Sequence, residues 1–285
     1  MNPVLLLEDI VSQYALENEN FLSANYITQL RNSVSVFSKY LDREATIEDL
    51  DPRKINAWLM ELKSKELAPK TVKLRRNSIL TLWKWCYESM IVDVPPRAKQ
   101  VRLKPGVPKT WTTQEICELV RIMLKDEKEM ANGIVKGVYF ASLTLALYSS
   151  GLRLADVLKA RRADVKDDGS YQLIANKTGR LIVRNLDPRA VGLALSSGKP
   201  RRELIWELPY NRSWIFKRFK EFTKKVGLEG STRFIRRSSA THTCQQQGIE
   251  EARKLLDHRS ISTLVNHYLS DLDSFKHDGP DRLEM

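Results

Sequence analysis

The chain reads His258-Arg259-Ser260-Ile261-Ser262-Thr263-Leu264-Val265-Asn266-His267-Tyr268 near its C-terminal end, with Arg233-Phe234-Ile235-Arg236-Arg237 upstream. These two runs put a basic cluster, a histidine and a lone tyrosine into one short helical region. A phenol beside guanidinium groups suggests attack of the tyrosine oxygen on a phosphodiester, because arginines can hold the non-bridging oxygens. This hypothesis requires a chain that binds nucleic acid.

The charge of the chain favours a polyanionic partner. Its 285 residues carry a formal net charge of +12, and the pI is about 9.6. Neutralising phosphates and releasing their counterions would drive association, so nucleic acid is the expected partner. The first 92 residues hold equal numbers of acidic and basic side chains, so the whole excess lies in residues 93–285. This asymmetry favours two functional units.

Cysteine usage and hydropathy argue against several other classes. Cys86, Cys117 and Cys244 are odd in number and widely spaced, which indicates neither a disulfide framework nor a zinc site. His242 beside Cys244 lacks a second pair of ligands. No run approaches the roughly eighteen apolar residues of a membrane helix, and no signal peptide is recognisable. We therefore expect a cytoplasmic, nucleoid-associated protein with no membrane contact, no metal and no cofactor.

The first 92 residues predict a small helical domain. Apolar residues at helical spacing run over residues 5–16 and 26–41, and Asp51-Pro52 places a cap and a first-turn proline before a third helix. A fourth helix over residues 70–89 begins with basic residues and ends with aromatic ones. We expect its basic end to contact DNA, through Lys70, Lys73, Arg75 and Arg76.

Residues 93–109 predict a linker. Four prolines and five basic residues break the helical and strand periodicities there, which indicates an extended cationic segment. We expect Lys99, Arg102 and Lys104 to follow a phosphate backbone. The predicted organisation is therefore a helical DNA-binding domain over 1–92, this linker, and a second domain over 110–285.

The second domain predicts helices around one hairpin. Thr112 and Glu115 have capping-box spacing ahead of one helix, and a long apolar helix is expected over residues 134–148. Two short apolar runs flank Asn176-Lys177-Thr178-Gly179, which is a hairpin signal. Further helices are expected over 187–195 and 213–226. The fold class is mainly α with a small β-hairpin or sheet, as an N-terminal helical domain followed by an α+β domain.

Four segments, in order, resemble the boxes of the tyrosine recombinase (phage integrase) family. The first box is Ser150-Gly151-Leu152-Arg153-Leu154-Ala155-Asp156-Val157-Leu158, and the hairpin box is Asn176-Lys177-Thr178-Gly179-Arg180. The second box is residues 233–242, and the last box is Leu255-Leu256-Asp257-His258 with Tyr268. One such match is common by chance, whereas four in the family's order are specific. The N-terminal helices and basic linker resemble the family's core-binding domain, so the resemblance covers nearly the whole chain.

The resemblance implies a catalytic role for six residues. Arg153, Arg233 and Arg236 would clamp the scissile phosphate, and Lys177 would protonate the leaving 5′ oxygen. His258 would hydrogen-bond the phosphate or help deprotonate the phenol. Tyr268 would be the nucleophile and form a 3′-phosphotyrosyl bond, which conserves the energy of the broken link without ATP or a metal. Arg237 would add a DNA contact.

Each role has a structural alternative. Arg153 could form only a salt bridge with Asp156, and Lys177 could be an exposed turn lysine. Arg233 could make an ordinary phosphate-backbone contact, and a lone histidine such as His258 is more often structural. The choice between these alternatives rests on the family positions.

The chain departs from the family pattern in three ways. Arg233 stands where the family usually has histidine, and a guanidinium can donate hydrogen bonds but cannot act as a base. Asp257 replaces a usual glycine. Tyr268 lies ten positions after His258, one more than the commonest family spacing.

The implied function is site-specific recombination or integration of double-stranded DNA through a Holliday junction. The resemblance also implies self-association on DNA, typically as a tetramer, with a tail at residues 269–285 docked on a neighbouring subunit. One alternative is a type IB topoisomerase-like enzyme that swivels one duplex, against which the small N-terminal domain and the tail argue. The other is a DNA-binding protein that has lost catalysis, for which Arg233 is the only support.

Overall fold

The computed structural model describes residues 5–103, 108–175, 179–198 and 202–268, with the backbone alone for residues 266–268. The chain divides into two compact units, Met1–Lys104 and Pro105–Met285. The division falls inside the segment expected to be a linker, whose limits at 93 and 109 stay a prediction.

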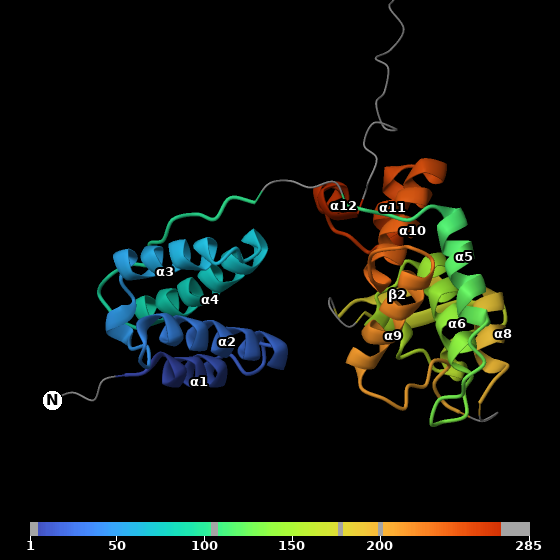
Figure 1. Ribbon diagram of the computed structural model, residues 1–285, viewed down its shortest axis with the longest axis horizontal. Coiled ribbons are helices and arrows are strands. Elements are labelled where there is room, and N and C mark those ends of the chain that lie inside the picture. Colours follow the sequence, from blue (N-terminus) through green and yellow to red (C-terminus); the bar gives the residue numbers. More distant parts are fainter. Residues whose placement is uncertain (1–4, 104–107, 176–178, 199–201, 269–285) are drawn as a thin grey trace, which may run out of the picture. The chain divides into compact units, whose positions relative to one another are not determined.

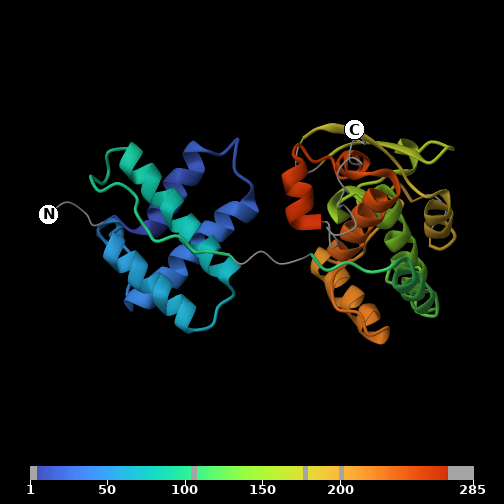
Figure 2. The ribbon, with the colours of Figure 1, turned by 90° about the horizontal axis from the view of Figure 1, so that it is seen from above.

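Helices make up most of the first unit (Figures 1 and 2): α1 (Leu7–Glu17), α2 (Ala24–Leu41), a short 3-10 turn (Ile47–Asp49), α3 (Pro52–Ser64) and α4 (Pro69–Glu88). The Asp51 side chain accepts hydrogen bonds from the backbone N–H groups of Arg53 and Lys54. Pro52 occupies the first helical position, where no backbone N–H is needed. The expected cap and proline therefore set the start of α3.

Aromatic side chains fill the core of the first unit. Trp58, Trp83 and Phe37 are fully buried, and the ring centroids of Phe37 and Trp58 lie 4.9 Å apart. Trp85 is half-buried, and its Nε1 donates to the Glu17 carboxylate at 2.8 Å. The tryptophans of α4 therefore serve packing, which is the more usual role for such residues.

The segment that follows α4 packs onto the first unit. The Trp83 indole donates to the carbonyl of Val94 at 2.7 Å. The Arg76 guanidinium donates to the carbonyls of Ala98 and Lys99, both at 2.7 Å. These bonds fix the backbone of the first part of the expected linker, while the Lys99 side chain stays exposed.

The described part of the second unit is mostly helical, with one two-stranded antiparallel sheet. In the sheet, Ser170 pairs with Asn185 and Ile174 pairs with Leu181. This agrees with the expected fold class. The elements are α5 (Thr113–Leu124), α6 (Lys136–Ser150), α7 (Leu154–Val157), a 3-10 turn (Arg162–Asp164), β1 (Ser170–Ile174), β2 (Leu181–Asn185), α8 (Pro188–Leu195), α9 (Arg212–Lys225), α10 (Thr232–Gln247), α11 (Ile249–Leu255) and α12 (Ile261–Tyr268).

Helix α6 forms the centre of the second unit. The consecutive residues Phe140, Ala141, Ser142 and Leu143 point to different sides of it and are all buried, which is typical of a helix inside a core. It packs against α5, α8 and α10 (Figure 1). Thr112 and Glu115 exchange the expected capping-box hydrogen bonds and so fix the start of α5.

A smaller apolar cluster joins the last three helices. Its buried members come from α10, α11 and α12 and are Ala240, Cys244, Ala252, Leu256 and Leu264. This cluster positions the turn that carries His258. Among the helices that the structure describes, none combines the length and the apolar character that a membrane span needs.

Candidate active site

A buried arginine joins two of the four boxes. Arg236, on the second turn of α10, is 6% exposed. Its Nη1 donates to the carbonyl of Gly151, and its Nη2 donates to the carbonyl of Leu256 at 2.8 Å. Gly151 belongs to the first box and Leu256 to the last box. Arg236 therefore brings segments that are far apart in the sequence into one site.

Gly151 lets these two boxes approach closely. It ends α6 in the left-handed conformation, with φ 59°. A Cβ at this position would lie 2.7 Å from Cγ of Leu255, which is closer than carbon atoms tolerate. Arg153 follows two residues later, half-buried at the N-cap of α7. The glycine of the first box thus sets how near Arg153 can come to the last box.

Gly151→Ala is expected to lower the free energy of unfolding by about 2–5 kcal/mol. The change adds a left-handed backbone cost of about 1–2 kcal/mol to an overpacking cost of about 1–3 kcal/mol. Gly227→Ala is the matched control, because its φ is 70° and nothing lies within 4 Å of the added Cβ. Urea unfolding followed by circular dichroism measures both variants. Equal losses would show that Leu255 moves aside at no cost.

The turn before His258 also has a left-handed residue. Asp257 has φ 51°, and the family pattern has glycine at this position, which a positive φ favours. Aspartate tolerates this conformation better than most residues do. The Asp257 carboxylate pairs with Arg180 at 3.4 Å. His258 follows at 8% exposure, and its carbonyl accepts a hydrogen bond from Arg253 at 2.9 Å.

Asp257→Gly is expected to change the free energy of unfolding by less than about 1 kcal/mol, because relief of the backbone offsets loss of a partly exposed ion pair. Asp257→Ala should destabilise the protein by about 1–2 kcal/mol, because it loses the pair and keeps the unfavourable φ. Urea unfolding of both variants measures the difference. An alanine variant as stable as the glycine variant would contradict the backbone argument.

The remaining arginines of the second box are more accessible. Arg233 is exposed on the first turn of α10. Arg237 is half-buried, with its guanidinium carbon 5.3 Å from the ring centroid of Phe234, a cation–π distance. Arg233 can therefore meet a ligand from solvent without rearrangement, whereas Arg236 is already bound to two carbonyls.

Helix α12 lies in the same cluster. It contacts α10 and α11, so the helix that ends at Tyr268 packs beside the elements that carry Arg236 and His258. The side chain of Tyr268 lies outside the described residues, as do Lys104, Lys177 and the tail at 269–285. The roles expected for these residues stay predictions.

The basic residues expected to contact DNA in the first unit differ in accessibility. Lys70, Lys73 and Arg102 are exposed, as is Lys99. Arg75 is half-buried and donates to Ser33 Oγ at 3.2 Å, and Arg76 holds the two carbonyls described above. DNA contact stays a prediction for all of these residues. Arg75 and Arg76 in addition have hydrogen-bond partners within the protein.

Sequence reasoning missed the bonds that hold the end of α6 against α10. Ser239 Oγ donates to the carbonyl of Tyr148 at 2.6 Å, and the Tyr148 hydroxyl lies 2.7 Å from Nδ1 of His242. Burial lowers the pKa of His242. Small residues beside Ser239 on α10 permit this close approach. Their run in the sequence was the signal that could have predicted close packing of α10 against another helix. His242 thus belongs to the support of the first box.

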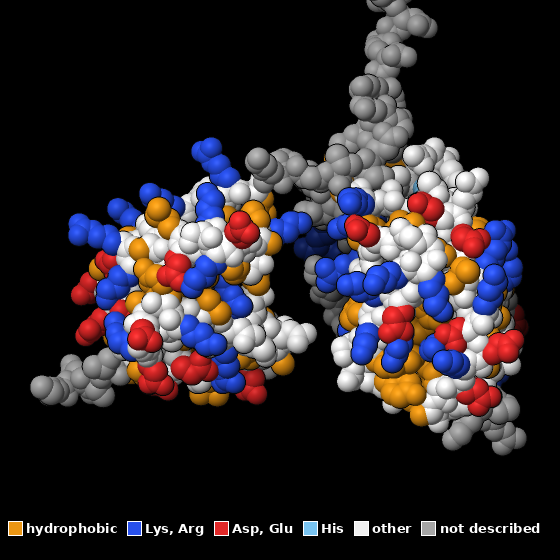
Figure 3. Space-filling view, viewed as in Figure 1, with side chains coloured by type: hydrophobic (Ala, Val, Ile, Leu, Met, Phe, Trp, Pro, Cys, Tyr) orange, Lys and Arg blue, Asp and Glu red, His pale blue; other side chains and the backbone are white. Residues whose placement is uncertain are grey.

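Cationic side chains do not gather into one patch on the faces that Figure 3 shows. In Figure 3, Lys and Arg side chains are spread over the visible faces of both units and interspersed with carboxylates. A hollow of about 530 Å³ adjoins the last box. It is lined mainly by cationic residues from β2 and the residue before it, from the end of α11 and from the turn after α11: Arg180, Arg184, Arg253, Lys254 and Arg259, with Asp257 and His258.

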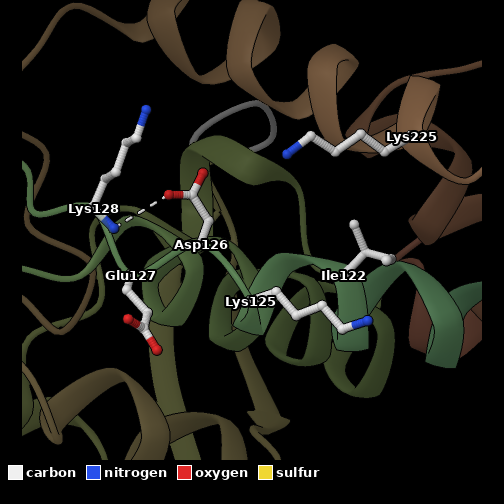
Figure 4. Close-up of a pocket in the computed structure, with 6 residues that line it drawn as sticks. All are labelled: Ile122, Lys125, Asp126, Glu127, Lys128 and Lys225. Atoms are coloured by element: carbon white, nitrogen blue, oxygen red, sulfur yellow. Dashed lines mark hydrogen bonds between the residues drawn. The ribbon is translucent and has the colours of Figure 1, made fainter.

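Another hollow lies at the end of α5, away from the boxes. It is about 620 Å³ in volume, and Lys125, Lys128 and Lys225 surround Asp126 there (Figure 4). Asp126 already pairs with Lys136 at 2.7 Å. Burial raises the pKa of its carboxyl, but the hydrogen bonds from Lys136 and Lys128 outweigh burial and hold that pKa below the usual range. None of the box residues that the structure describes lines this hollow.

Comparisons with known proteins agree with this architecture. Residues 11–89 match the family model "Phage integrase, N-terminal SAM-like domain". The chain is 21% identical over 277 residues to a Pseudomonas aeruginosa protein named "Putative tyrosine recombinase XerC". That match covers 86% of this chain and 65% of the relative, so the chain spans about two thirds of the length of the curated relative.

Solved integrase structures share the fold. A lambda integrase dimer bound to a core site superposes with a TM-score of 0.73 at 16% identity, covering 98% of this chain and 81% of that one. The Tn1549 transposon integrase in complex with circular intermediate DNA gives 0.70 at 12% identity, covering 95% and 98%.

Fold and site geometry define a two-unit protein with the fold of the solved integrases, in which a helical N-terminal unit precedes a second unit that joins the boxes through Arg236. The N-terminal unit matches a phage integrase SAM-like domain, and the chain as a whole is similar in sequence to a protein named as a tyrosine recombinase.

Proposed function

We propose that this protein is a site-specific DNA recombinase that cuts and rejoins strands through a 3′-phosphotyrosyl intermediate and a Holliday junction. The observation that carries the proposal is the pair of hydrogen bonds from Arg236 to the first and last boxes. It supports one shared site for residues that the sequence alone could only place in order. The helix ending at Tyr268 packs against the same elements.

The reaction assigns a task to each box residue. Arg153 and Arg233 hold the non-bridging oxygens of the scissile phosphate, with Arg236 completing the clamp and fixing its geometry. The Tyr268 oxygen attacks phosphorus and the 5′ oxygen leaves, taking a proton from Lys177. His258 donates to the phosphate or accepts the phenol proton. Attack of the 5′ hydroxyl of a partner strand on the phosphotyrosine then reseals the DNA.

The proposed partners are double-stranded DNA and further copies of the chain. One related structure is a lambda integrase tetramer bound to a Holliday junction, with a TM-score of 0.72 at 16% identity. By analogy we propose a tetramer on DNA, with residues 269–285 docking between subunits. The protein would work in the cytoplasm, associated with the nucleoid, without cofactor or metal.

Covalent capture tests this function even when the target site has not been identified. The full chain is incubated with fragmented genomic DNA of its host, and the mixture is then denatured. DNA that remains bound to protein is recovered and sequenced. One enriched sequence attached through a 3′ phosphate is the expected result. If no DNA sequence is enriched among the fragments attached to protein, the result would favour a DNA-binding protein without catalysis.

The captured site then distinguishes site-specific recombination from type IB topoisomerase-like activity. A plasmid with two copies of the site should yield exchanged products, and a plasmid with one copy should relax little. Efficient relaxation with one copy and no exchange with two would favour a type IB topoisomerase-like activity.

DNA binding is expected to weaken steeply with salt. The slope of log K against log salt is negative, and each phosphate contact contributes about 0.9 to its magnitude. Replacing Lys99, Arg102 and Lys104 by glutamine should therefore make the slope shallower by up to about 3. Filter binding across a salt series measures this slope. A control triple replaces Arg121, Arg161 and Arg189, each of which already pairs with a carboxylate. A slope that falls equally in both triples would exclude a specific role for the segment after α4.

A further inference from the structure

We propose that Arg184 on β2 is a positioning residue for His258, acting by clamping the C-terminal end of α11. The inference deepens the proposed recombinase function and rests on it for its catalytic consequence. Its structural part stands on the contacts of Arg184 alone.

Arg184 binds the backbone of two elements. Its Nη1 donates to the carbonyl of Val183 in its own strand at 2.7 Å. Its Nη2 donates to the carbonyl of Lys254 at 2.7 Å, and its Nε donates to the carbonyl of Leu255 at 3.1 Å. The last carbonyls of a helix lack a partner within the helix, and Arg184 supplies donors to two of them in α11. The carbonyl of Lys254 also accepts the backbone N–H of Asp257 at 3.0 Å.

Three successive carbonyls are held in this way by two arginines. Arg184 takes those of Lys254 and Leu255, and Arg236 takes that of Leu256. Asp257 and then His258 follow directly. The backbone that leads into His258 is thus fixed from β2 on one side and from α10 on the other.

A second link joins the other end of β2 to this turn. Arg180, just before β2, pairs with the carboxylate of Asp257 at 3.4 Å. Arg253 donates to the carbonyl of His258, and Lys254 pairs with Glu251 at 2.6 Å. The cations of the hollow beside the last box are therefore largely bound to protein oxygens. This occupancy favours a clamp over a separate phosphate pocket.

The clamp sets where the His258 imidazole lies. Loss of Arg184 would remove one donor from each of these carbonyls. The carbonyl of Lys254 would keep the N–H of Asp257 at 3.0 Å, but the side-chain link from β2 to the turn would be lost and the turn could shift. A displacement of about 1 Å of a reacting group can slow catalysis by up to about a hundredfold. Arg184 thus acts through His258 and need not touch the DNA.

Histidine NMR tests the clamp without a DNA substrate. The full chain has four histidines, so the side-chain signals can be assigned with His258→Gln and His242→Gln variants. Arg184→Ala should move the His258 signals and leave the His242 signals in place. Arg184→Lys can still donate to one carbonyl and should restore the His258 signals in part. It also replaces the alanine variant in this test if that variant does not fold. Arg189→Ala is the control, because Arg189 is exposed and pairs with Asp187 at the start of α8.

Adduct kinetics on the captured site test the consequence. At saturating DNA, Arg184→Ala should form the covalent adduct about tenfold to a hundredfold more slowly, with an unchanged half-saturating concentration and partial recovery in Arg184→Lys. Unmoved His258 signals, or a wild-type adduct rate in Arg184→Ala, would overturn the inference. Absence of adduct in the wild type would instead refute the proposed function, and the NMR result would still decide the clamp.

Discussion

Tyr268→Phe is expected to abolish formation of the covalent protein–DNA adduct while DNA affinity stays unchanged. The change removes one oxygen and little volume, and the mechanism has no other nucleophile. Losing an enzyme's nucleophile typically costs a factor on the order of 10³ or more in rate. A nicked duplex with the captured site accumulates the adduct, because the cut strand diffuses away before it can be rejoined. Denaturing gels measure the adduct, and gel shifts measure affinity.

Tyr87→Phe is the matched control, since Tyr87 is an exposed residue of the first unit. It should form the adduct at the wild-type rate. The next tyrosine upstream of Tyr268 is Tyr210, which lies outside every box and whose hydroxyl accepts the N–H of Ala131 at 3.1 Å. An adduct in Tyr268→Phe would move the nucleophile to another residue and would refute this part of the proposal.

Local signals in the sequence predicted most of the fold. Asp51-Pro52 and the pair Thr112 and Glu115 each place a cap at a definite residue, and α3 and α5 begin there. The apolar run over residues 134–148 predicted the central helix, because a helix that is apolar on all sides must be buried. These features depend on residues within one or two helical turns, which a sequence displays directly.

The support of the candidate site depends on contacts that no local pattern encodes. The sequence placed Arg236 in a phosphate clamp but could not show that it binds the carbonyls of Gly151 and Leu256. No sequence motif marks Arg184, because its partners lie at the end of a helix about 70 positions further along the chain. The departure at Asp257 was visible, and its positive φ now accounts for the glycine expected there.

Arg236→Ala is expected to lower the free energy of unfolding by about 2–5 kcal/mol and to abolish adduct formation. Two effects on stability oppose each other. Removing the buried guanidinium relieves the cost of its desolvation, which stabilises the variant. Loss of the donors to two buried carbonyls costs about 1–3 kcal/mol each, and this larger effect makes the net change destabilising. Urea unfolding followed by tryptophan fluorescence measures the loss.

Arg233→Ala provides the contrast, because Arg233 is exposed on the same helix. Its stability should stay within about 0.5 kcal/mol of the wild type, as is usual for surface changes, while cleavage slows by loss of a charge-assisted donor. Arg233→His should keep most of the cleavage rate if the position only donates a hydrogen bond. Equal stability of the Arg236→Ala and Arg233→Ala variants would show that Arg236 does not hold the boxes together, and full activity of Arg233→Ala would place Arg233 outside the site.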